Sequence, residues 1–409
     1  MSDNKSKFKR TLGLLDVLMF GVGGIVGAGI YAIIGETAGL AGNMLWASFA
    51  VAAAIALLTG LAYAEFSSQF PDAGGSFEYI KESFGKKTAL WLSIIMLLTG
   101  VVAPAAIAIS FSDYLGRLID LPHWMTTLAV IGLMGAVNII GVQQSSWFNG
   151  IATAVTLIGL GAVVWLAVPQ WGTTHLLTPP DTGWEGVLSG SALIFFSYVG
   201  FEDLVKTAEE VKEPEKIMPR GIIISGVVVM VVYLLIAISA VSVLPTEQLA
   251  KSNGPLAEVM STVAGPGWVT ALVVVALFAT SKTVLSNILG SSRLLFDVAR
   301  DSSFKWMQKL TTVDEKRGTP TFSIIAISVL VAGFAMIGNL KIVASISNIF
   351  VFILFISVNA ALIYYRKNHE KGKDAPFQVP LNIRNVPILT VIALLGLLIL
   401  LGFNIYNLL

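Results

Sequence analysis

Long apolar runs separated by short polar segments dominate the chain. A membrane-spanning helix needs about 20 mostly apolar residues, because about 1.5 Å of rise per residue must cover about 30 Å of hydrocarbon. The runs are continuous and lack the alternation typical of strands in a membrane barrel, so they predict an all-α membrane protein. By this criterion about eleven helices are expected to span the bilayer, over residues 13–36, 42–66, 88–112, 125–141, 147–168, 186–205, 220–243, 267–296, 321–338, 342–365 and 386–407.

The composition favours the same class of protein and excludes several others. Of the 409 residues, 55% are hydrophobic and 12% are charged, and the mean hydropathy is +0.80. Soluble proteins carry about 25% charged residues, so this chain is too apolar for a soluble enzyme or a disordered protein. The net charge of +1 gives no reason to expect nucleic-acid binding. With no cysteine and three scattered histidines, neither a metal site nor a cofactor is expected.

Basic residues indicate the orientation. With the N-terminus in the cytoplasm, 22 Lys and Arg residues fall in inside segments and 3 in outside segments, as the positive-inside rule requires. The basic residues before the first apolar run also resemble a signal peptide. That run is too long, has no obvious cleavage site and is followed by further spans, so it is expected to be retained. We therefore expect residues 1–12 to form the cytoplasmic tail of a multi-pass protein in the plasma membrane.

Two of the expected spans contain residues that interrupt a helix. Residues 21–30 read GVGGIVGAGI, and five glycines in ten residues cost roughly 1 kcal/mol each relative to alanine. Close packing between helices through small residues is one explanation. The other is a helix that leaves regular geometry to approach a ligand. The sixth span reads FFSYVGFED over 195–203, with Gly200 inside it. Interrupted helices at matching positions of two halves are typical of transporters.

The positions of these two segments predict an inverted repeat. Five spans over 13–168 and five over 186–365 would be followed by an extra helix over 386–407, and an odd number of spans per half inverts the second half. The N-terminus of a half-helix suits a carboxylate, and unwound carbonyls suit an ammonium group. A zwitterionic amino acid offers both groups, so the pattern favours an amino-acid carrier. A dinucleotide-binding motif over 27–32 is rejected because it lies inside a span.

Four segments resemble the amino acid–polyamine–organocation (APC) superfamily of amino-acid permeases. They are GVGGIVGAGIY (21–31), AYAEFSSQFPDAGGSFEYIKESFG (62–85), FFSYVGFEDLVKTAEEVKEPEKIMPRGI (195–222) and SSRLLFDVARDSSF (291–304). The resemblance implies one transmembrane transporter domain with the leucine-transporter-like 5+5 inverted repeat and with broken helices 1 and 6. Most members have twelve spans, so the last helix of the family is expected to be missing here.

The resemblance also implies a set of substrate-binding residues in the two broken segments. The N–H groups of the G-x-G stretch would hold the substrate carboxylate, and carbonyls of both segments would accept from its ammonium group. The N–H groups belong to Gly27, Ala28 and Gly29, and the carbonyls belong to Ile25, Phe196 and Val199, next to Gly200. The Phe196 ring occupies the family's gating position. Ser197 and Tyr198 would shape the pocket, and Glu202 matches an acidic position at the intracellular side of the break.

Ionisable residues within the spans are costly and are functional by default. Glu65 and Asp203 lie near span ends, where bonding to water or loop backbone is the alternative to a coupling role. For Glu202, beside the broken segment, a structural or gating role is favoured. Lys282 lies deep in the eighth span, which argues against a lysine that reaches the interface.

Lys282 is the clearest departure from sodium-coupled relatives. In those proteins two small residues of the eighth span coordinate sodium against carbonyls of the first, and the resemblance maps them to Ser281 and Lys282. Some sodium-independent members place a lysine from the fifth span there, where this chain has Thr156. We predict that the Lys282 ammonium replaces sodium and bonds carbonyls around Gly24 to Gly27. A lysine that can lose its proton would couple transport to protons, whereas a permanent cation would leave exchange or uniport.

The sequence thus predicts a sodium-independent, proton-coupled secondary transporter of neutral amino acids, because the nameable pocket residues are apolar or small. A carrier of cationic amino acids or polyamines is the alternative. A membrane enzyme is disfavoured because Ser281 and Lys282 point about 100° apart on a helix, and a channel or sensor because broken helices fit alternating access. Expected partners are an amino acid, protons and the lipid bilayer, with the protein a monomer or a homodimer. Polar residues expected to bond across helices are Asn138, Asn348 and Asn359.

Overall fold

The computed structural model describes residues 10–71, 75–300, 305–314, 317–369 and 375–409. Each of the eleven predicted ranges contains a helix. Of the expected cytoplasmic tail over 1–12, only residues 10–12 lie within the described part of the chain, and the 291–304 segment is described only to residue 300.

The first half of the chain consists of helices that follow the apolar runs closely. Its first helix begins where the Gly13 N–H donates to the Asp16 carboxylate at 2.8 Å, which satisfies one of the free amides of the first turn. The elements are α1 (Leu14–Ile25), α2 (Gly29–Ala41), η1 (Gly42–Met44), α3 (Leu45–Gln69), α4 (Ser76–Phe84), α5 (Lys86–Leu115), α6 (His123–Ile140), α7 (Val142–Ala167) and η2 (Val168–Gln170).

The second half is also helical, except for one short hairpin. Arg384 and Asn385 both have positive φ at its two-residue turn, as hairpin turns of this length require. The elements are α8 (Trp184–Ile194), η3 (Phe195–Tyr198), α9 (Phe201–Leu204), η4 (Val205–Glu210), α10 (Pro214–Val243), α11 (Thr246–Lys251), α12 (Pro255–Ala264), α13 (Gly267–Arg300), η5 (Lys305–Thr311), α14 (Thr321–Ala335), α15 (Leu340–Asn368), β1 (Asn382–Ile383), β2 (Val386–Pro387) and α16 (Ile388–Tyr406).

Nine helical stretches within the described residues are long and apolar enough to cross a membrane. The predicted number was eleven, and the difference has two physical causes. The first expected span is broken after Ile25, which leaves α1 with 12 residues, and α14 has 15 residues. Both are apolar but fall short of the length of a continuous span.

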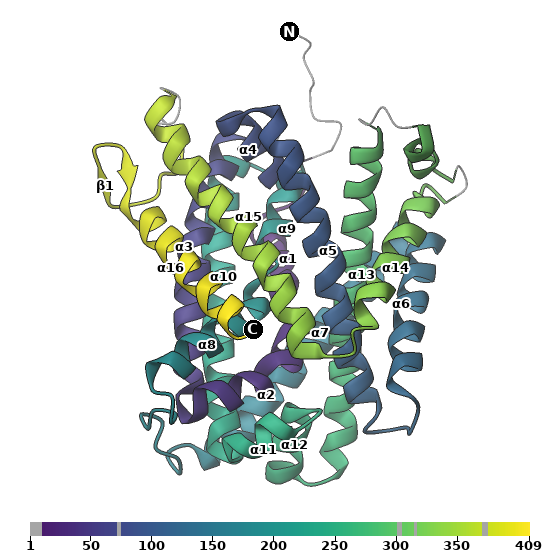
Figure 1. Cartoon of the computed structure of the whole chain (residues 1–409), viewed down its shortest axis with the longest axis vertical. Coiled ribbons are helices and arrows are strands. Elements are labelled where there is room, and N and C mark those ends of the chain that lie inside the picture. Colours follow the sequence, from purple (N-terminus) through teal and green to yellow (C-terminus); the bar gives the residue numbers. More distant parts are fainter. Residues whose placement is uncertain (1–9, 72–74, 301–304, 315–316, 370–374) are drawn as a thin grey trace.

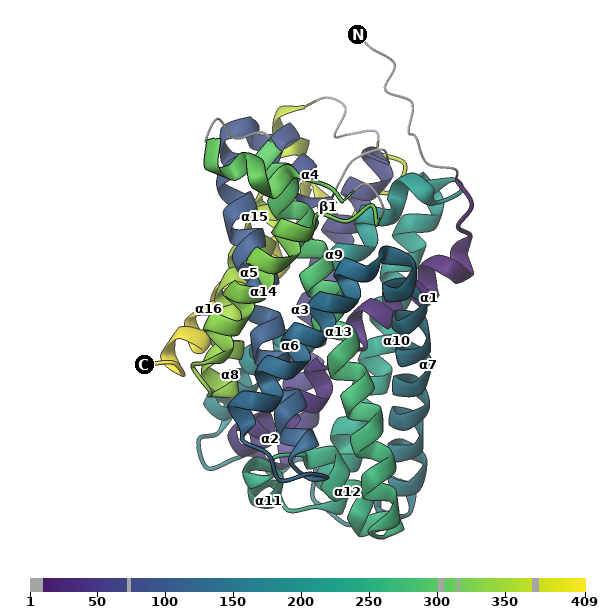
Figure 2. The ribbon, with the colours of Figure 1, turned by 90° about the vertical axis from the view of Figure 1, so that its right-hand side faces the viewer.

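The long helices form a bundle along the long axis of the molecule, as Figures 1 and 2 show. The short helix α4 and the β1–β2 hairpin lie at one end, and α11 and α12 lie at the other. A continuous apolar cluster fills the interior, with Tyr31, Phe49 and Phe355 among its fully buried rings. Large apolar side chains also cover the outside, where Ile158 is 73% and Trp165 is 79% exposed. An apolar exterior of this kind suits a surrounding of lipid rather than water.

Candidate functional site

The first broken segment joins α1 to α2 in the interior of the bundle. α1 ends at Ile25, Val26 leaves helical geometry with ψ of 84°, and α2 begins at Gly29. A Cβ on Gly29 would lie 2.7 Å from the Cα of Ser197, which is closer than real Cβ atoms approach backbone. The glycine therefore allows the start of α2 to touch the second broken segment.

The second broken segment joins α8 to α9. α8 ends at Ile194, the single turn η3 follows, and Gly200 turns the chain with φ of 137° before α9 begins at Phe201. A Cβ on Gly200 would lie 2.7 Å from the carbonyl oxygen of Gly24. Both the φ value and the contact exclude a side chain at this position, so the two breaks meet at Gly200 and Gly24.

Glu202 satisfies a backbone group that the second break leaves free. Its Oε2 accepts from the Gly200 N–H at 2.7 Å, so the half-buried carboxylate closes the turn in front of α9. Asp203 is exposed and pairs with Lys206 at 2.5 Å, one turn further along the same helical segment. The two neighbouring acids thus lie in different surroundings, and Glu202 is the one joined to the break.

The Lys282 ammonium lies against the first broken segment. Its Nζ donates to the carbonyl oxygens of Gly23 at 2.7 Å and Val26 at 3.0 Å, and to the Thr153 hydroxyl at 3.1 Å. The side chain is 3% exposed. Three acceptors around one ammonium match its three N–H donors, which is how a protein can hold a buried cation. Ser281 is also buried beside it in α13.

The contact from α7 is made by Thr153, not by Thr156. Thr156, which the resemblance placed where some members carry a lysine, instead donates to the Ala152 carbonyl of its own helix at 2.7 Å. The two threonines are three residues apart and nearly share a face of the helix, so the shift is close to one helical turn.

The remaining groups of the first break have partners from two other helices. The Tyr233 hydroxyl of α10 donates to the Ile25 carbonyl at 3.1 Å, and the Ala28 N–H donates to the Thr283 hydroxyl of α13 at 3.2 Å. With the two Lys282 bonds, the break is held by α10 on one side and α13 on the other. The Gly27 N–H donates to the same Ile25 carbonyl at 2.8 Å. The main-chain groups of Ile25, Gly27 and Ala28 that the resemblance assigned to the substrate are thus bonded within the protein.

Polar side chains without a partner lie beside the start of α2. The hydroxyls of Ser197 and Tyr31 are buried and make no hydrogen bond within the described part of the chain. The Ser197 Oγ lies 2.9 Å from the position that a Cβ on Gly29 would occupy. Buried hydroxyls are ordinarily hydrogen-bonded, so an unpaired one at a helix N-terminus points to a polar ligand.

The other predicted residues of η3 lie at the same break with different partners. Phe196 and Tyr198 are buried and Val199 is half-buried. The Tyr198 hydroxyl donates to the Phe49 carbonyl of α3 at 3.1 Å. Tyr198 therefore anchors the second break to α3 through its hydroxyl.

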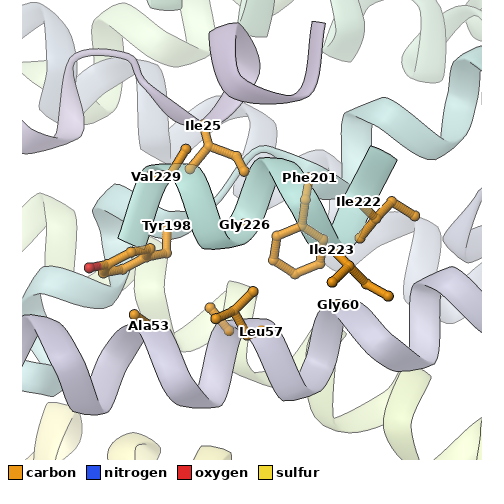
Figure 3. A pocket seen from close by; sticks show the side chains of 11 residues that line it. Ile25, Ala53, Leu57, Gly60, Tyr198, Phe201, Ile222, Ile223, Gly226 and Val229 are labelled. Carbon is orange, nitrogen blue, oxygen red and sulfur yellow. The ribbon is translucent and has the colours of Figure 1, made fainter. Parts of the chain in front are cut away.

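A small apolar cavity lies between α3, α10 and the two breaks. Figure 3 shows the side chains of Ile25, Tyr198, Phe201 and Val229 around it. Its volume of about 20 Å³ is close to the minimum for one water molecule and far below that of an amino acid. In this conformation the cavity therefore has no room for an amino acid.

Glu65 lies away from the breaks, at the α4 end of α3. Its carboxylate forms a two-pronged ion pair with Arg366 of α15, with Arg366 Nε at 2.5 Å from Oε1, and it accepts from the Val379 N–H at 2.7 Å. Arg366 also donates to the Asn382 side chain of β1. Both charged groups are buried, with 0% and 3% of the side chains exposed. The ion pair therefore connects α3, α15 and the hairpin, and it does not line a substrate pocket at the breaks.

A polar pocket of about 310 Å³ opens at the opposite end of the bundle, beside α11 and α12. Arg117 at the end of α5 lies across it and bonds Ser252 at 2.7 Å and Glu258 at 3.3 Å. Burial alone would raise the pKa of Glu258, but its hydrogen bonds to Ser252, Gln248 and Arg117 together lower this pKa below the ordinary value. These contacts tie α12 to α5 and cover this end of the bundle.

The three predicted asparagines do bond across helices. Asn138 donates to the Leu285 carbonyl at 3.0 Å, Asn359 reaches Thr59 at 3.3 Å, and Asn348 donates to the Ala192 carbonyl at 2.9 Å. The Asn348 contact satisfies the end of α8, where the break removes the usual helical donor. No group of three or more acidic or histidine side chains within the described ranges could hold a metal ion.

Sequence reasoning missed Tyr233, Thr153 and Arg366 as contacts of these sites. A single tyrosine or threonine in an apolar run carries no signal of its partner. Arg366 follows an apolar run, where basic residues are common for reasons of orientation alone.

The interrupted helices, the apolar exterior and the buried cation on the first break define a multi-pass membrane protein of the transporter class. Comparison with known proteins identifies the family: a family model described as amino acid permease matches residues 12–408. The chain therefore belongs to the amino acid permease family of the APC superfamily, which is a family of transporters and not of enzymes.

Individual relatives differ in the substrate that their names give. The chain is 29% identical to the chloroplastic cationic amino acid transporter 7 of Arabidopsis thaliana, over 88% of this chain and 66% of that protein. It is 28% identical to the branched-chain amino acid permease BcaP of Bacillus subtilis, over 98% of this chain and 90% of that protein. An uncharacterized transporter of Mycobacterium tuberculosis is 29% identical over 88% of this chain and 81% of that protein. The chain thus spans just under two thirds of the length of the Arabidopsis transporter.

Proposed function

We propose that this protein carries neutral amino acids across the plasma membrane without sodium, in symport with protons. The observation that carries the proposal is the Lys282 ammonium on the Gly23 and Val26 carbonyls. A cation bound at these carbonyls would ordinarily have to come from solution. Here the protein supplies it, so binding of sodium at the same place would bring two positive charges together.

Proton coupling follows from the surroundings of Lys282. The described hydrogen-bond partners of its Nζ are two carbonyls and a hydroxyl, and none of them carries a negative charge. This buried ammonium is held by dipoles alone, and we propose that it gives up its proton during the transport cycle. The neutral amine would bind the carbonyls more weakly, so we infer that loss of the proton loosens α1.

The start of α2 is the proposed carboxylate site. The N–H groups of Gly27 and Ala28 are already bonded, so the first N–H groups of α2 itself, from Gly29 onward, are the proposed donors. The positive dipole end of α2 favours an anion, and the unpaired Ser197 hydroxyl adds a further donor. The ammonium group of the substrate would bind the carbonyls of Phe196 and Val199, because the Ile25 carbonyl already accepts from the Gly27 N–H and the Tyr233 hydroxyl. Neutral side chains are preferred because the nameable pocket residues are apolar or small, and a branched-chain permease is among the relatives.

The proposal extends to the architecture. We infer a leucine-transporter-like 5+5 inverted repeat, with the first repeat over 13–168, the second over 186–365, an extra helix over 386–407 and eleven spans in all. The interruptions between α1 and α2 and between α8 and α9 support it, since they fall in the first and sixth predicted spans. We further propose that the N-terminus is cytoplasmic, which places α4 inside and α12 outside.

A carrier of cationic amino acids is the second candidate, because four Arabidopsis relatives are named cationic amino acid transporters with over 25% identity. Such a substrate needs a free acidic group near its side chain. Glu202 is the acid nearest the breaks that the sequence pointed to, and its carboxylate accepts from the Gly200 N–H. The neutral substrate is therefore the preferred reading.

Uptake into proteoliposomes tests the proposal. Labelled leucine, isoleucine, valine, alanine, lysine and arginine would be offered in sodium-free buffer, with and without an inward proton gradient. We expect a neutral amino acid to accumulate and the gradient to increase its uptake. Uptake only after addition of sodium would overturn the role of Lys282, and uptake of lysine and arginine alone would establish the second candidate.

A further inference from the structure

The β1–β2 hairpin lies at the outer edge of the bundle, directly before α16 (Figure 1). β2 ends at Pro387 and α16 begins at Ile388, so no linker separates the two elements. α16 has 19 residues, which at about 1.5 Å each rise about 28 Å and only just cross the hydrocarbon layer of about 30 Å. Ile388 must therefore lie at the edge of the hydrocarbon, and the hairpin must lie in the headgroup layer next to it.

The hairpin directs apolar side chains away from the protein. Leu381 is 66% exposed and Ile383 is 63% exposed. Between them, the Asn382 side chain bonds back to the protein, where it accepts from Arg366 and donates to the Val379 carbonyl at 3.0 Å. An inward side chain between two outward ones matches the alternation along a strand. The two apolar side chains therefore share one outward face.

Leu381 has a backbone conformation that suits leucine poorly. Its φ is 60°, in the left-handed region where a large side chain crowds the backbone. The Ile388 N–H holds it there by donating to the Leu381 carbonyl at 3.0 Å. Packing inside the protein does not compensate, because most of the side chain is exposed. Contact with lipid would compensate, as it does for Leu395 and Ile399 of α16, which are 54% and 53% exposed.

We propose that this hairpin is a membrane anchor, in which Leu381 and Ile383 enter the boundary between headgroups and acyl chains and the Arg384 guanidinium meets a lipid phosphate. Arg384 is exposed at the turn of the hairpin, and no partner of its side chain is found among the described residues. An apolar pair beside a cation matches phospholipid, which offers acyl chains and phosphates at this depth. Because Asn382 bonds Arg366, the anchor is joined to the buried ion pair with Glu65. It would thus hold the adjacent ends of α3 and α15 at a fixed depth in the bilayer.

Fluorescence in proteoliposomes tests the anchor. The sequence contains no cysteine, so Ile383→Cys provides a single thiol for a polarity-sensitive fluorophore such as NBD. The full chain would be reconstituted into vesicles of phosphatidylcholine and phosphatidylglycerol, with a nitroxide near the top of one acyl chain in part of the phosphatidylcholine. The reference is Glu215→Cys, an exposed charged position in the first turn of α10. We expect the fluorophore on Ile383→Cys to emit at shorter wavelength and to be quenched several-fold more strongly by the nitroxide.

A second variant tests the role of the neighbouring leucine. Asparagine tolerates a φ of 60° better than leucine does, so Leu381→Asn preserves the backbone and removes the apolar group. Added to Ile383→Cys, it should roughly halve the nitroxide quenching, because one of the two apolar side chains is lost. The matched control is Leu177→Asn in the loop before α8, where the leucine is 77% exposed. This control should leave the quenching unchanged.

Three results would overturn the inference. The first is equal emission and equal quenching at Ile383→Cys and Glu215→Cys, which would place the hairpin in water. The second is emission at shorter wavelength without lipid quenching, together with disulfide cross-linking of two chains through Ile383→Cys, which would make a second copy the occupant of this face. The third is unchanged quenching after Leu381→Asn. None of these measurements requires transport, so failure of the proposed substrate would leave the anchor standing.

Discussion

Replacement of Lys282 by methionine is the most direct perturbation of the proposed mechanism. Methionine has a similar length and no charge, so it fills the space between α13 and the first break without supplying a donor. The carbonyls of Gly23 and Val26 and the Thr153 hydroxyl would each lose a partner. Because the side chain is 3% exposed, water cannot replace the ammonium without opening the bundle.

The magnitude follows from counting the groups left unpaired. Each buried carbonyl without a donor costs about 1–3 kcal/mol, so the two carbonyls together cost about 2–6 kcal/mol. Methionine also removes the penalty of several kcal/mol for burying a cation, so global stability changes less than this sum. The cost of the two unpaired carbonyls weakens the contact between the first break and α13, because both carbonyls lose their partner there. At about 2 kcal/mol, the population with α1 undocked rises about 30-fold.

Two assays measure separately the contact of the first break with α13 and the coupling of transport to protons. The sequence contains no cysteine, and Val26 is fully buried in the first break, so Val26→Cys would introduce a single buried thiol. The rate of maleimide labelling at this thiol should rise about 30-fold when Lys282→Met is added, and uptake of leucine should lose its stimulation by a proton gradient. Lys86→Met is the matched control, because Lys86 is exposed at the start of α5. If Lys282→Met transported leucine with the proton stimulation of the wild type, the assignment of proton coupling to this lysine would be refuted.

Three further perturbations test other contacts. Arg366→Met leaves the Glu65 carboxylate buried and unpaired, so the free energy of unfolding should fall by about 3–5 kcal/mol, and an unchanged melting temperature would contradict this. Gly200→Ala should abolish folded transporter, because φ of 137° and the Gly24 carbonyl exclude a Cβ, whereas Gly161→Ala, with open space around it in α7, should retain or gain up to about 1 kcal/mol of stability. Glu258→Gln should lower the melting temperature above pH 4.5, and its difference from wild type should vanish as the pH falls through the lowered folded pKa; a difference that grew in acid would show the opposite sign.

The all-helical class and the position of the breaks could be predicted because both depend on residues that are close together in the sequence. Long apolar runs are costly in any surrounding but lipid, and five glycines within 21–30 disfavour a regular helix. The exact turning points needed the structure. Gly200 is required by contact with the Gly24 carbonyl, and Gly29 by contact with Ser197, both of them far away in sequence.

Partners across the bundle could be predicted only where a residue was conspicuous. Lys282 is a charge deep in an apolar run, so the sequence predicts that it needs hydrogen-bond acceptors. The carbonyls around Gly24 were the predicted acceptors because the glycines there interrupt the helix. Thr153 and Tyr233 are ordinary residues of membrane helices, and nothing in their own segments indicates which carbonyl they reach. The choice between Thr153 and Thr156 depends on the rotation of α7 about its axis, which packing against α13 sets.

The two donors to the first break come from helices on opposite sides of it, and this has a consequence for the proposed transport cycle. Tyr233 of α10 bonds the last carbonyl of α1, while Lys282 of α13 bonds two carbonyls around the same turn. If α1 moves with α10, with which it packs along its length, the Tyr233 bond persists and the Lys282 bonds must break. Two bonds to a charged donor are expensive to break at once, whereas those of a neutral amine are weaker. On this reasoning proton release from Lys282 and release of α1 from α13 are one event, and a fixed cation serves where sodium would have to dissociate.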